Sequence, residues 1–310
     1  MNVNYFIKNV FLIKINIITL INKKMGIFFC KDKENEDELV FVKSKDDDIQ
    51  FPPYFSKADS IFDKLKENNL FKNITLIEYI NLLANINTEN ADIPYEGPYL
   101  MNFSYEDSQK FINSNVSDEL YGDFITKAIL SHRTIGEKES IFRNVCLEIY
   151  KILKQKIQEY YNDEEAQVTK KDLIGLGIFF CKGTNSYKMK LIYDLFKNDK
   201  GDLEQNKNFD EFLLSSFLIV SSCLMNAKKS INQINPLLSE DSLDKIDKFL
   251  EIYSLKNCED LVQYFNLNFF NRVKLTFYEY NLNLTKANGF GWIFSPSGIR
   301  QKLEENKFLD

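Results

Sequence analysis

Four carboxylates gather around Gly201 in one short stretch of the chain. They are Asp199, Asp202, Glu204 and Glu211. Calcium takes about six to eight oxygen ligands, which carboxylates supply, and a glycine permits the sharp turn of a calcium loop. The spacing is irregular, and Lys200 stands where a regular loop carries its first ligand. We therefore expect either a weak calcium site, with calcium as the only cofactor, or an acidic turn that is simply solvated.

A second motif with chemical meaning is the string MGIFFCK at residues 25–31, which resembles an N-myristoylation start. If translation begins at Met25, Gly26 would carry the myristoyl chain, Cys30 could carry a palmitoyl chain, and residues 1–24 would be absent. Two acyl chains anchor a protein where one is marginal. The alternative is an unmodified apolar N-terminus, because Cys30 stands where Ser or Thr is usual and the string GIFFCK recurs at 177–182.

Four segments share one arrangement. Each follows a helix and a short polar stretch, and begins with an aliphatic residue or its equivalent. An acid stands four positions later, and an apolar residue follows the acid. They are Ile74–Tyr79, Val168–Leu173, Lys207–Phe212 and Leu275–Tyr280. The arrangement resembles the exit half of an EF-hand, as in calcineurin-B and neuronal calcium sensors, and the EF-hand-like N-terminal part of myristoylated TLDc-domain proteins. The resemblance implies that the aliphatic residue makes a short β contact with a partner loop, that the acid is a calcium ligand, and that the next apolar residue begins the core face of the second helix.

Most of these loops lack the ligands that calcium needs. A regular loop carries oxygen ligands at positions one, three, five, seven, nine and twelve, with glycine at six. Counting back from Glu78, Asp172 and Glu279, ligand positions fall on Phe71, Tyr161 and Arg272. We therefore expect loops that are mostly structural and free of metal.

The periodicity of apolar residues predicts an all-α fold of EF-hand-like helix-loop-helix pairs in one or two helical lobes. Predicted helices cover 56–68, 76–84, 104–113, 117–131, 138–161, 171–181, 187–198, 209–227, 242–253, 258–266, 275–283 and 296–308. We expect an N-terminal tail, lipid-anchor segment and linker at 1–50, a helical lobe with one degenerate hand at 51–145, and a paired lobe with C-terminal helices at 146–310. The last predicted helix either docks in the protein's own groove as a target helix would, or packs as an ordinary terminal helix.

Composition disfavours several classes of function. A net charge of −6 without a basic stripe disfavours nucleic acid as a partner. The five cysteines are widely spaced, which predicts buried thiols in a reducing compartment. His132 is the only histidine and no catalytic motif is present, so we do not expect an enzyme. The apolar stretch at 15–21 is too short to span a bilayer.

Taken together, these features predict a cytoplasmic regulatory or adaptor protein. It would bind an amphipathic helix of a protein partner through a hydrophobic groove, mostly without calcium, and lipidation at Gly26 and Cys30 would hold it at the cytosolic face of a membrane. Two alternatives are a calcium sensor with one irregular site and a structural helical component of a larger assembly.

Overall fold

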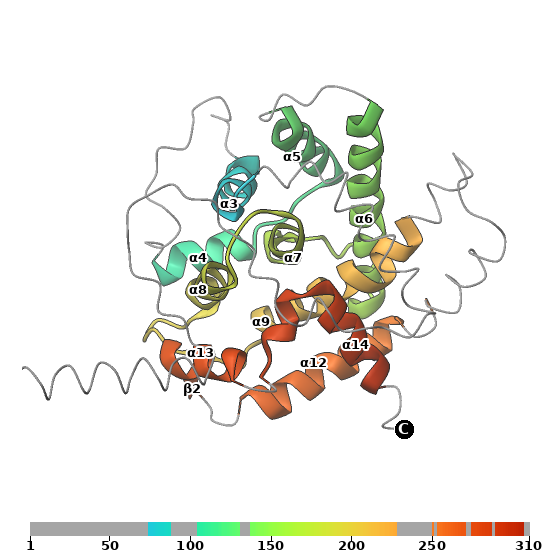
Figure 1. Cartoon of the computed structure of the whole chain (residues 1–310). Helices are drawn as coiled ribbons and strands as arrows, with labels where there is room; N and C mark the ends of the chain where they lie inside the picture. Colours follow the sequence, from blue (N-terminus) through green and yellow to red (C-terminus); the bar gives the residue numbers. More distant parts are fainter. Residues whose placement is uncertain are drawn as a thin grey trace, which may run out of the picture. The chain divides into compact units, whose positions relative to one another are not determined.

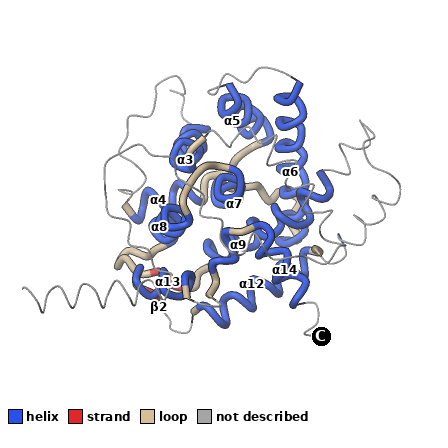
Figure 2. Tube along the Cα trace, viewed as in Figure 1, coloured by secondary structure: helices blue, strands red, loops and turns tan. Residues whose placement is uncertain are grey.

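The helices predicted from apolar spacing are present throughout the part of the chain that the computed structural model describes. That part comprises residues 74–87, 104–130, 137–227, 250, 253–270, 274–286 and 289–306. The main helices are α3 (Leu76–Ala84), α4 (Tyr105–Ile112), α5 (Asp118–Leu130), α6 (Glu137–Tyr161), α7 (Lys170–Phe180), α8 (Asn185–Phe196), α9 (Lys207–Leu218), α12 (Leu255–Phe269), α13 (Phe277–Thr285) and α14 (Pro296–Asn306). Figure 2 shows how completely helix dominates, so the all-α expectation is confirmed for the described residues.

Several helices begin at an N-cap that the sequence provides. At the start of α3, α7 and α13 a threonine is followed three residues later by an acid, whose carboxylate accepts a hydrogen bond from the threonine backbone N–H. The pairs are Thr75 with Glu78 (2.7 Å), Thr169 with Asp172 (2.7 Å) and Thr276 with Glu279 (3.0 Å). This is the capping-box arrangement, which satisfies a backbone donor that the helix itself leaves unpaired.

The loops between helices are joined in pairs by short backbone ladders. Strand β1 (Leu203–Glu204), between α8 and α9, runs antiparallel to strand β2 (Lys274–Leu275), between α12 and α13, with Leu203 opposite Leu275. Both leucines are buried. Two helix-loop-helix units are therefore held together through their loops.

A second pair of loops is joined in the same way. Asn115, between α4 and α5, forms an antiparallel bridge with Thr169, between α6 and α7. The backbone N–H of Val116 donates to the Val168 carbonyl at 2.8 Å. A parallel bridge between Thr75 and Lys182 then connects the start of α3 to the turn between α7 and α8.

One contact position differs from the sequence expectation. Val168 and Leu275 lie at ladders, as predicted, but the third segment makes its contact through Leu203 and not through Lys207. Lys207 is instead the first residue of α9, because Asn206 is the N-cap and accepts a hydrogen bond from the Phe209 N–H at 3.0 Å.

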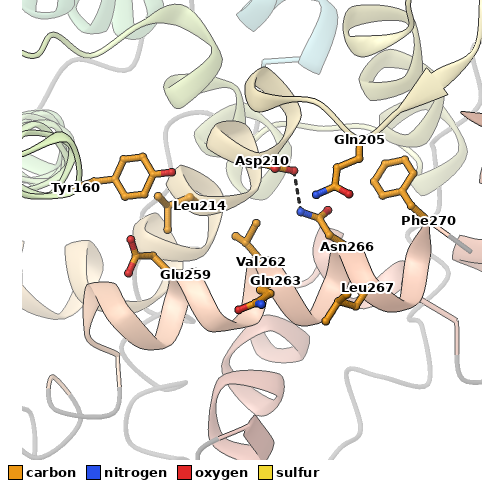
Figure 3. Close-up of a pocket in the computed structure, with 10 residues that line it drawn as sticks. All are labelled: Tyr160, Gln205, Asp210, Leu214, Glu259, Val262, Gln263, Asn266, Leu267 and Phe270. Carbon is orange, nitrogen blue, oxygen red and sulfur yellow. Dashed lines mark hydrogen bonds between the residues drawn. The ribbon is translucent and has the colours of Figure 1, made fainter. Parts of the chain in front are cut away.

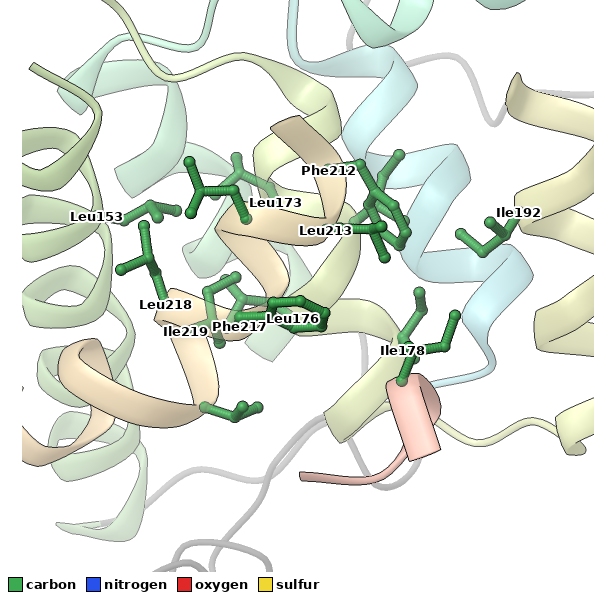
Figure 4. Close-up of a cluster of buried hydrophobic side chains, with 14 of the residues drawn as sticks. Leu153, Leu173, Leu176, Ile178, Ile192, Phe212, Leu213, Phe217, Leu218 and Ile219 are labelled. Atoms are coloured by element: carbon green, nitrogen blue, oxygen red, sulfur yellow. The ribbon is translucent and has the colours of Figure 1, made fainter. Parts of the chain in front are cut away.

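Helix α7 runs through the middle of the described fold and contacts α3, α4 and α9 (Figure 1). Every residue of α7 except Phe179 is buried. Its Leu173 and Leu176 lie among Phe212, Leu213 and Phe217 of α9 in the core (Figure 4). A helix that is buried on nearly every face is typical of the interior of a larger protein.

The expected boundary between residues 145 and 146 falls inside α6, which runs from Glu137 to Tyr161. One hydrophobic cluster includes side chains from α3 through α14, on both sides of that position. All described residues belong to one compact unit of the chain, residues 41–310. The expected boundary at residue 50 and the predicted helix at 56–68 lie outside the described residues, as do most residues of the predicted helix at 242–253.

The C-terminal segment completes this core. The short helix η6 (Gly291–Phe294) and α14 pack against α12 and the π-helical segment η5 (Ile219–Cys223) that continues α9. Arg300 of α14 is only 2% exposed and donates a hydrogen bond to the Val220 carbonyl at 3.4 Å. Burial lowers the pKa of Arg300 to about 10.

Two glycines in α7 allow its neighbours to approach closely. A Cβ at Gly177 would lie 2.5 Å from the Tyr79 ring, and one at Gly175 would lie 2.7 Å from Ser216 Oγ. The Tyr79 ring is buried and its hydroxyl donates to the Leu173 carbonyl at 2.8 Å, so the ring is fixed on α7.

We predict that Gly177→Ala destabilises the fold by about 1–3 kcal/mol, because it overpacks this contact. Gly122→Ala in α5 is the matched control, since nothing lies within 4 Å of the added methyl group. The control should gain about 0.5–1 kcal/mol, because alanine loses less backbone entropy in a helix than glycine. Urea unfolding followed by circular dichroism measures both, and shifts of the same sign would contradict the packing described here.

The sequence expectation of buried thiols is confirmed for the four cysteines that the structure describes. Cys146, Cys181, Cys223 and Cys258 are free and buried, and Cys30 lies outside the described residues. Burial raises the pKa of all four thiols above its ordinary value, and that of Cys258 to about 12. Because the thiolate is the reactive form, these side chains are both inaccessible and unreactive.

We predict that a Cys30→Ser protein at pH 8 releases no colour from a thiol-disulfide reagent within minutes in its folded state. In guanidinium chloride the same protein should titrate four thiols per chain. Rapid native reaction of even one thiol would show that its surroundings are open to solvent.

Candidate functional site

The acidic loop between α8 and α9 is held in shape by hydrogen bonds of its own. The Asn198 Oδ1 atom accepts from the backbone N–H groups of Lys200 and Asp202, both at 3.0 Å. Gly201 has a φ of 85°, in the left-handed region that glycine adopts without strain. The Tyr193 hydroxyl donates to the Gly201 carbonyl at 2.6 Å. The turn therefore has a defined conformation that its own side chains stabilise.

The structure places the four candidate calcium ligands on different parts of this region. Asp199 is exposed, Asp202 and Glu204 are half-buried, and Glu211 is buried on the second turn of α9. Within the described residues, no group of three or more acidic, histidine or cysteine side chains is arranged to share a metal ion. Calcium binding by this loop stays one of the two alternatives that the sequence predicts.

Glu211 contacts a lysine from another helix. Its Oε2 atom lies 2.7 Å from Lys171 Nζ on α7, and the two side chains are 7% and 8% exposed. The Tyr161 hydroxyl, at the end of α6, donates to the same carboxylate, and Lys207 lies 3.4 Å from it. A buried ion pair with further hydrogen bonds satisfies two charges that would otherwise be costly inside a protein.

The Lys171 ammonium group also contacts the loop after α4, which belongs to the second pair of loops. It donates to Asn113 Oδ1 at 3.2 Å and to Asn208 Oδ1 at 3.3 Å. Asn208 in turn donates to Gln109 Oε1 on α4 at 2.9 Å. One network of polar groups thus joins α4, α7 and α9.

Asp172 is a buried carboxylate beside this network, and its hydrogen bonds come from neutral groups. It accepts hydrogen bonds from Ser215 Oγ at 2.7 Å and from the Thr169 backbone N–H. Burial raises the pKa of Asp172, while these hydrogen bonds and the charge of Lys171 oppose the increase. The acid that the sequence places at a calcium-ligand position therefore serves to cap α7 and to attach it to α9.

A pocket of about 500 Å³ lies between α9 and α12, beside the end of α6 (Figure 3). We call it the α9–α12 pocket. Its lining residues are Tyr160, Gln205, Asp210, Leu214, Glu259, Val262, Gln263, Asn266, Leu267 and Phe270. Leu267 is 74% exposed at this site, so an apolar side chain faces solvent next to a cavity.

Two polar side chains of this pocket are hydrogen-bonded to one another. Asn266 donates through Nδ2 to Asp210 Oδ1 at 2.8 Å, drawn as a dashed line in Figure 3. Burial raises the pKa of Asp210, while hydrogen bonds from Asn266 and Gln205 oppose the increase. Asn266 is only 7% exposed, and its Oδ1 atom has no hydrogen-bond partner among the described residues.

Sequence reasoning missed Lys171 and Asn266, although both leave a signal. Lys171 stands at the start of a helix that is otherwise apolar on most faces, so its charge requires a buried partner. Asn266 lies four residues after Val262 on α12 and four before the C-cap Phe270, which puts a polar group on an apolar helix face. Such residues are found by asking which group forms a hydrogen bond or ion pair with each polar side chain that is expected to be buried.

Two further features bear on membranes. The lipidation candidates Gly26 and Cys30 lie outside the described residues. Among the described residues, one helical run, Lys207–Ala227, is long and apolar enough to cross a membrane, with a mean hydropathy of 1.3. However, 89% of that window is buried inside the protein, as in the core helix of a folded domain.

No family model matches this sequence, and searches of curated proteins and of solved structures find no match either.

We predict that replacing one partner of the buried ion pair lowers the free energy of unfolding more than replacing both partners. Glu211→Leu alone should cost about 3–5 kcal/mol, because it leaves the Lys171 charge buried, whereas Glu211→Leu with Lys171→Met should cost less. Glu305→Gln breaks the exposed pair with Lys302 and should change stability by less than about 1 kcal/mol. Denaturant unfolding measures all three, and a double variant less stable than the single one would contradict the buried pairing.

Proposed function

We propose that this chain is an EF-hand-like adaptor protein that binds a helix of a protein partner at the α9–α12 pocket and does not need calcium to hold its loops. Two ladders support the EF-hand-like part of the proposal. The loops that contain Leu203 and Leu275 are joined antiparallel, and so are the loops that contain Asn115 and Thr169. Helix-loop-helix units paired through their loops are the arrangement that the sequence resemblance implies.

The proposal that the loops do not need calcium rests on one observation. Lys171 Nζ lies 2.7 Å from Glu211 Oε2. A calcium ion that used Glu211 would have to take this carboxylate from a buried ammonium group and leave that charge without a partner. Glu78, Asp172 and Glu279 each accept a hydrogen bond from their own N-cap. The carboxylates that a calcium loop would use thus already accept hydrogen bonds from the protein's own N–H groups.

The α9–α12 pocket supports the partner-binding part. It combines an apolar wall, formed by Leu214 and Val262, with the exposed side chain of Leu267. An amphipathic partner helix binds in this manner when it inserts apolar side chains into a groove and leaves its polar face in water. Among the described residues that line the pocket, none is a lysine, arginine or histidine. A partner segment that carries positive charge is therefore favoured.

We predict that isothermal titration of the full chain with calcium gives no binding heat, with magnesium as the control ion. The Glu211→Gln variant should behave identically, provided that circular dichroism shows it folded. Calcium-dependent heat in the native chain that is lost in Glu211→Gln would overturn the calcium-independent reading and establish a sensor that uses the irregular loop.

A further inference from the structure

The outer side of α13, next to β2, is apolar although it faces water (Figure 1). Phe277, Tyr278 and Leu282 lie on this side, and Tyr278 is 75% and Leu282 46% exposed. The described residues include seven exposed large hydrophobic side chains, and three of them fall within this helix of nine residues. Because Tyr278 and Leu282 are four residues apart, they are neighbours on the helix surface. We call these three side chains the α13 face.

The inner side of α13 fixes this orientation. Tyr280 and Leu284 are buried in the core, and Asn283 donates through Nδ2 to the Phe269 carbonyl at 3.1 Å. Turning the helix to bury Tyr278 would expose Tyr280 and break this hydrogen bond. The described fold therefore leaves the α13 face uncovered, and exposed apolar side chains that lie together are typical of a contact surface.

Lysines surround the α13 face. Lys274 precedes the helix and Lys286 follows it, and both are exposed. Lys190 of α8 lies beside the face, with its Nζ atom 5.4 Å from the centre of the Phe277 ring. Ammonium groups therefore stand at both ends of the apolar side chains and next to them.

The carboxylates nearby are less exposed than these lysines. Asp194 is buried and contacts two lysines of its own. Glu279 is half-buried and accepts a hydrogen bond from the Thr276 backbone N–H at 3.0 Å. Glu204 is half-buried opposite Lys274 in the ladder. The charges that a partner of the α13 face would meet first are positive, so an anionic partner is favoured.

We propose that the α13 face binds the surface of a lipid bilayer that carries anionic headgroups. Phe277, Tyr278 and Leu282 would enter the boundary between headgroups and acyl chains, while Lys274 and Lys286 would contact the headgroup anions. Helices that bind a membrane surface combine aromatic or leucine side chains with lysines in this way. The proposal depends neither on the α9–α12 pocket nor on lipidation.

A fluid surface fits the α13 face better than a folded partner or a second copy of this chain. A stable protein interface buries about 800 Å² on each partner, which three partly exposed side chains do not supply. Tyr278 and Leu282 protrude from a convex helix, and lipid chains adapt to such a shape without preformed pockets. The net charge of −6 does not prevent this contact, because charges more than about 8 Å away are largely screened at physiological ionic strength.

The test uses the full chain without acylation, made in bacteria, and two kinds of vesicle. One kind is phosphatidylcholine alone, and the other also contains phosphatidylserine. Sedimentation of the vesicles measures the bound fraction. The chain should bind the anionic vesicles, more weakly as salt is added, and should bind the neutral vesicles much less. Absence of binding to anionic vesicles at low salt, or equal binding to both kinds, would overturn the proposal.

Variants of exposed residues assign the binding to the α13 face. Tyr278→Gln with Leu282→Gln should weaken binding by about tenfold or more, because apolar area is lost from the membrane contact. Tyr105→Gln in α4 is the matched control, since Tyr105 is also exposed but stands beside Glu106 and Asp107. Unchanged affinity of the double variant, with a native circular dichroism spectrum, would overturn the assignment.

The two flanking lysines are tested separately. Lys274→Gln and Lys286→Gln should each weaken binding to anionic vesicles by about fivefold and reduce its dependence on salt, because each lysine near an anionic surface contributes about 1 kcal/mol. Circular dichroism checks that both variants are folded. Full affinity and full salt dependence in both variants would show that other charges attract the membrane, which would overturn the role of these lysines.

A fluorescent label locates the contact. Leu282→Cys in a Cys30→Ser chain carries an environment-sensitive dye, and the four buried thiols stay unlabelled in the folded protein. The dye should shift to the blue with anionic vesicles, whereas the same dye at Lys151→Cys, an exposed position of α6, should not. Equal shifts at both positions would overturn the proposal. So would a lipid-free dimer that Tyr278→Gln with Leu282→Gln dissociates, because the face would then join two copies.

Discussion

The ammonium group of Lys171 and the carboxylate of Glu211 meet at 2.7 Å inside the protein, where neither can be hydrated by bulk water. The two charges compensate one another inside the protein, which favours one register of α7 against α9. The same lysine contacts Asn113 and Asn208, which brings the loop after α4 into the arrangement. The ion pair and its hydrogen bonds thus join α7 to α9 and to the loop after α4.

Much of the helical organisation could be predicted from local sequence. The helix predicted at 76–84 is α3 with the same bounds, since its threonine cap and apolar spacing are both local signals. The pattern predicts the loop contact at Lys207, whereas the ladder forms at Leu203. Lys207 is instead the first residue of α9, after the N-cap Asn206, and helix starts are predicted from sequence only to within one or two residues.

The candidate site is harder to predict, because its contacts join residues that are distant in the sequence. Glu211 was singled out for its charge, yet the sequence pattern does not reveal that Lys171 lies beside it. Likewise, the expected boundary between residues 145 and 146 falls inside α6, which is continuous from Glu137 to Tyr161. Asn266 becomes informative only when the burial of its amide oxygen is known.

The packing of η6 and α14 against α12 has a consequence for how the protein is made. Ile299 and Leu303 are buried in the same core as residues of α3, and Arg300 hydrogen-bonds to η5. During synthesis α9 and α12 leave the ribosome before residues near position 300, so their apolar faces lack this cover in the meantime. Until residues near position 300 have emerged, the apolar faces of α9 and α12 are open to chaperones or to aggregation.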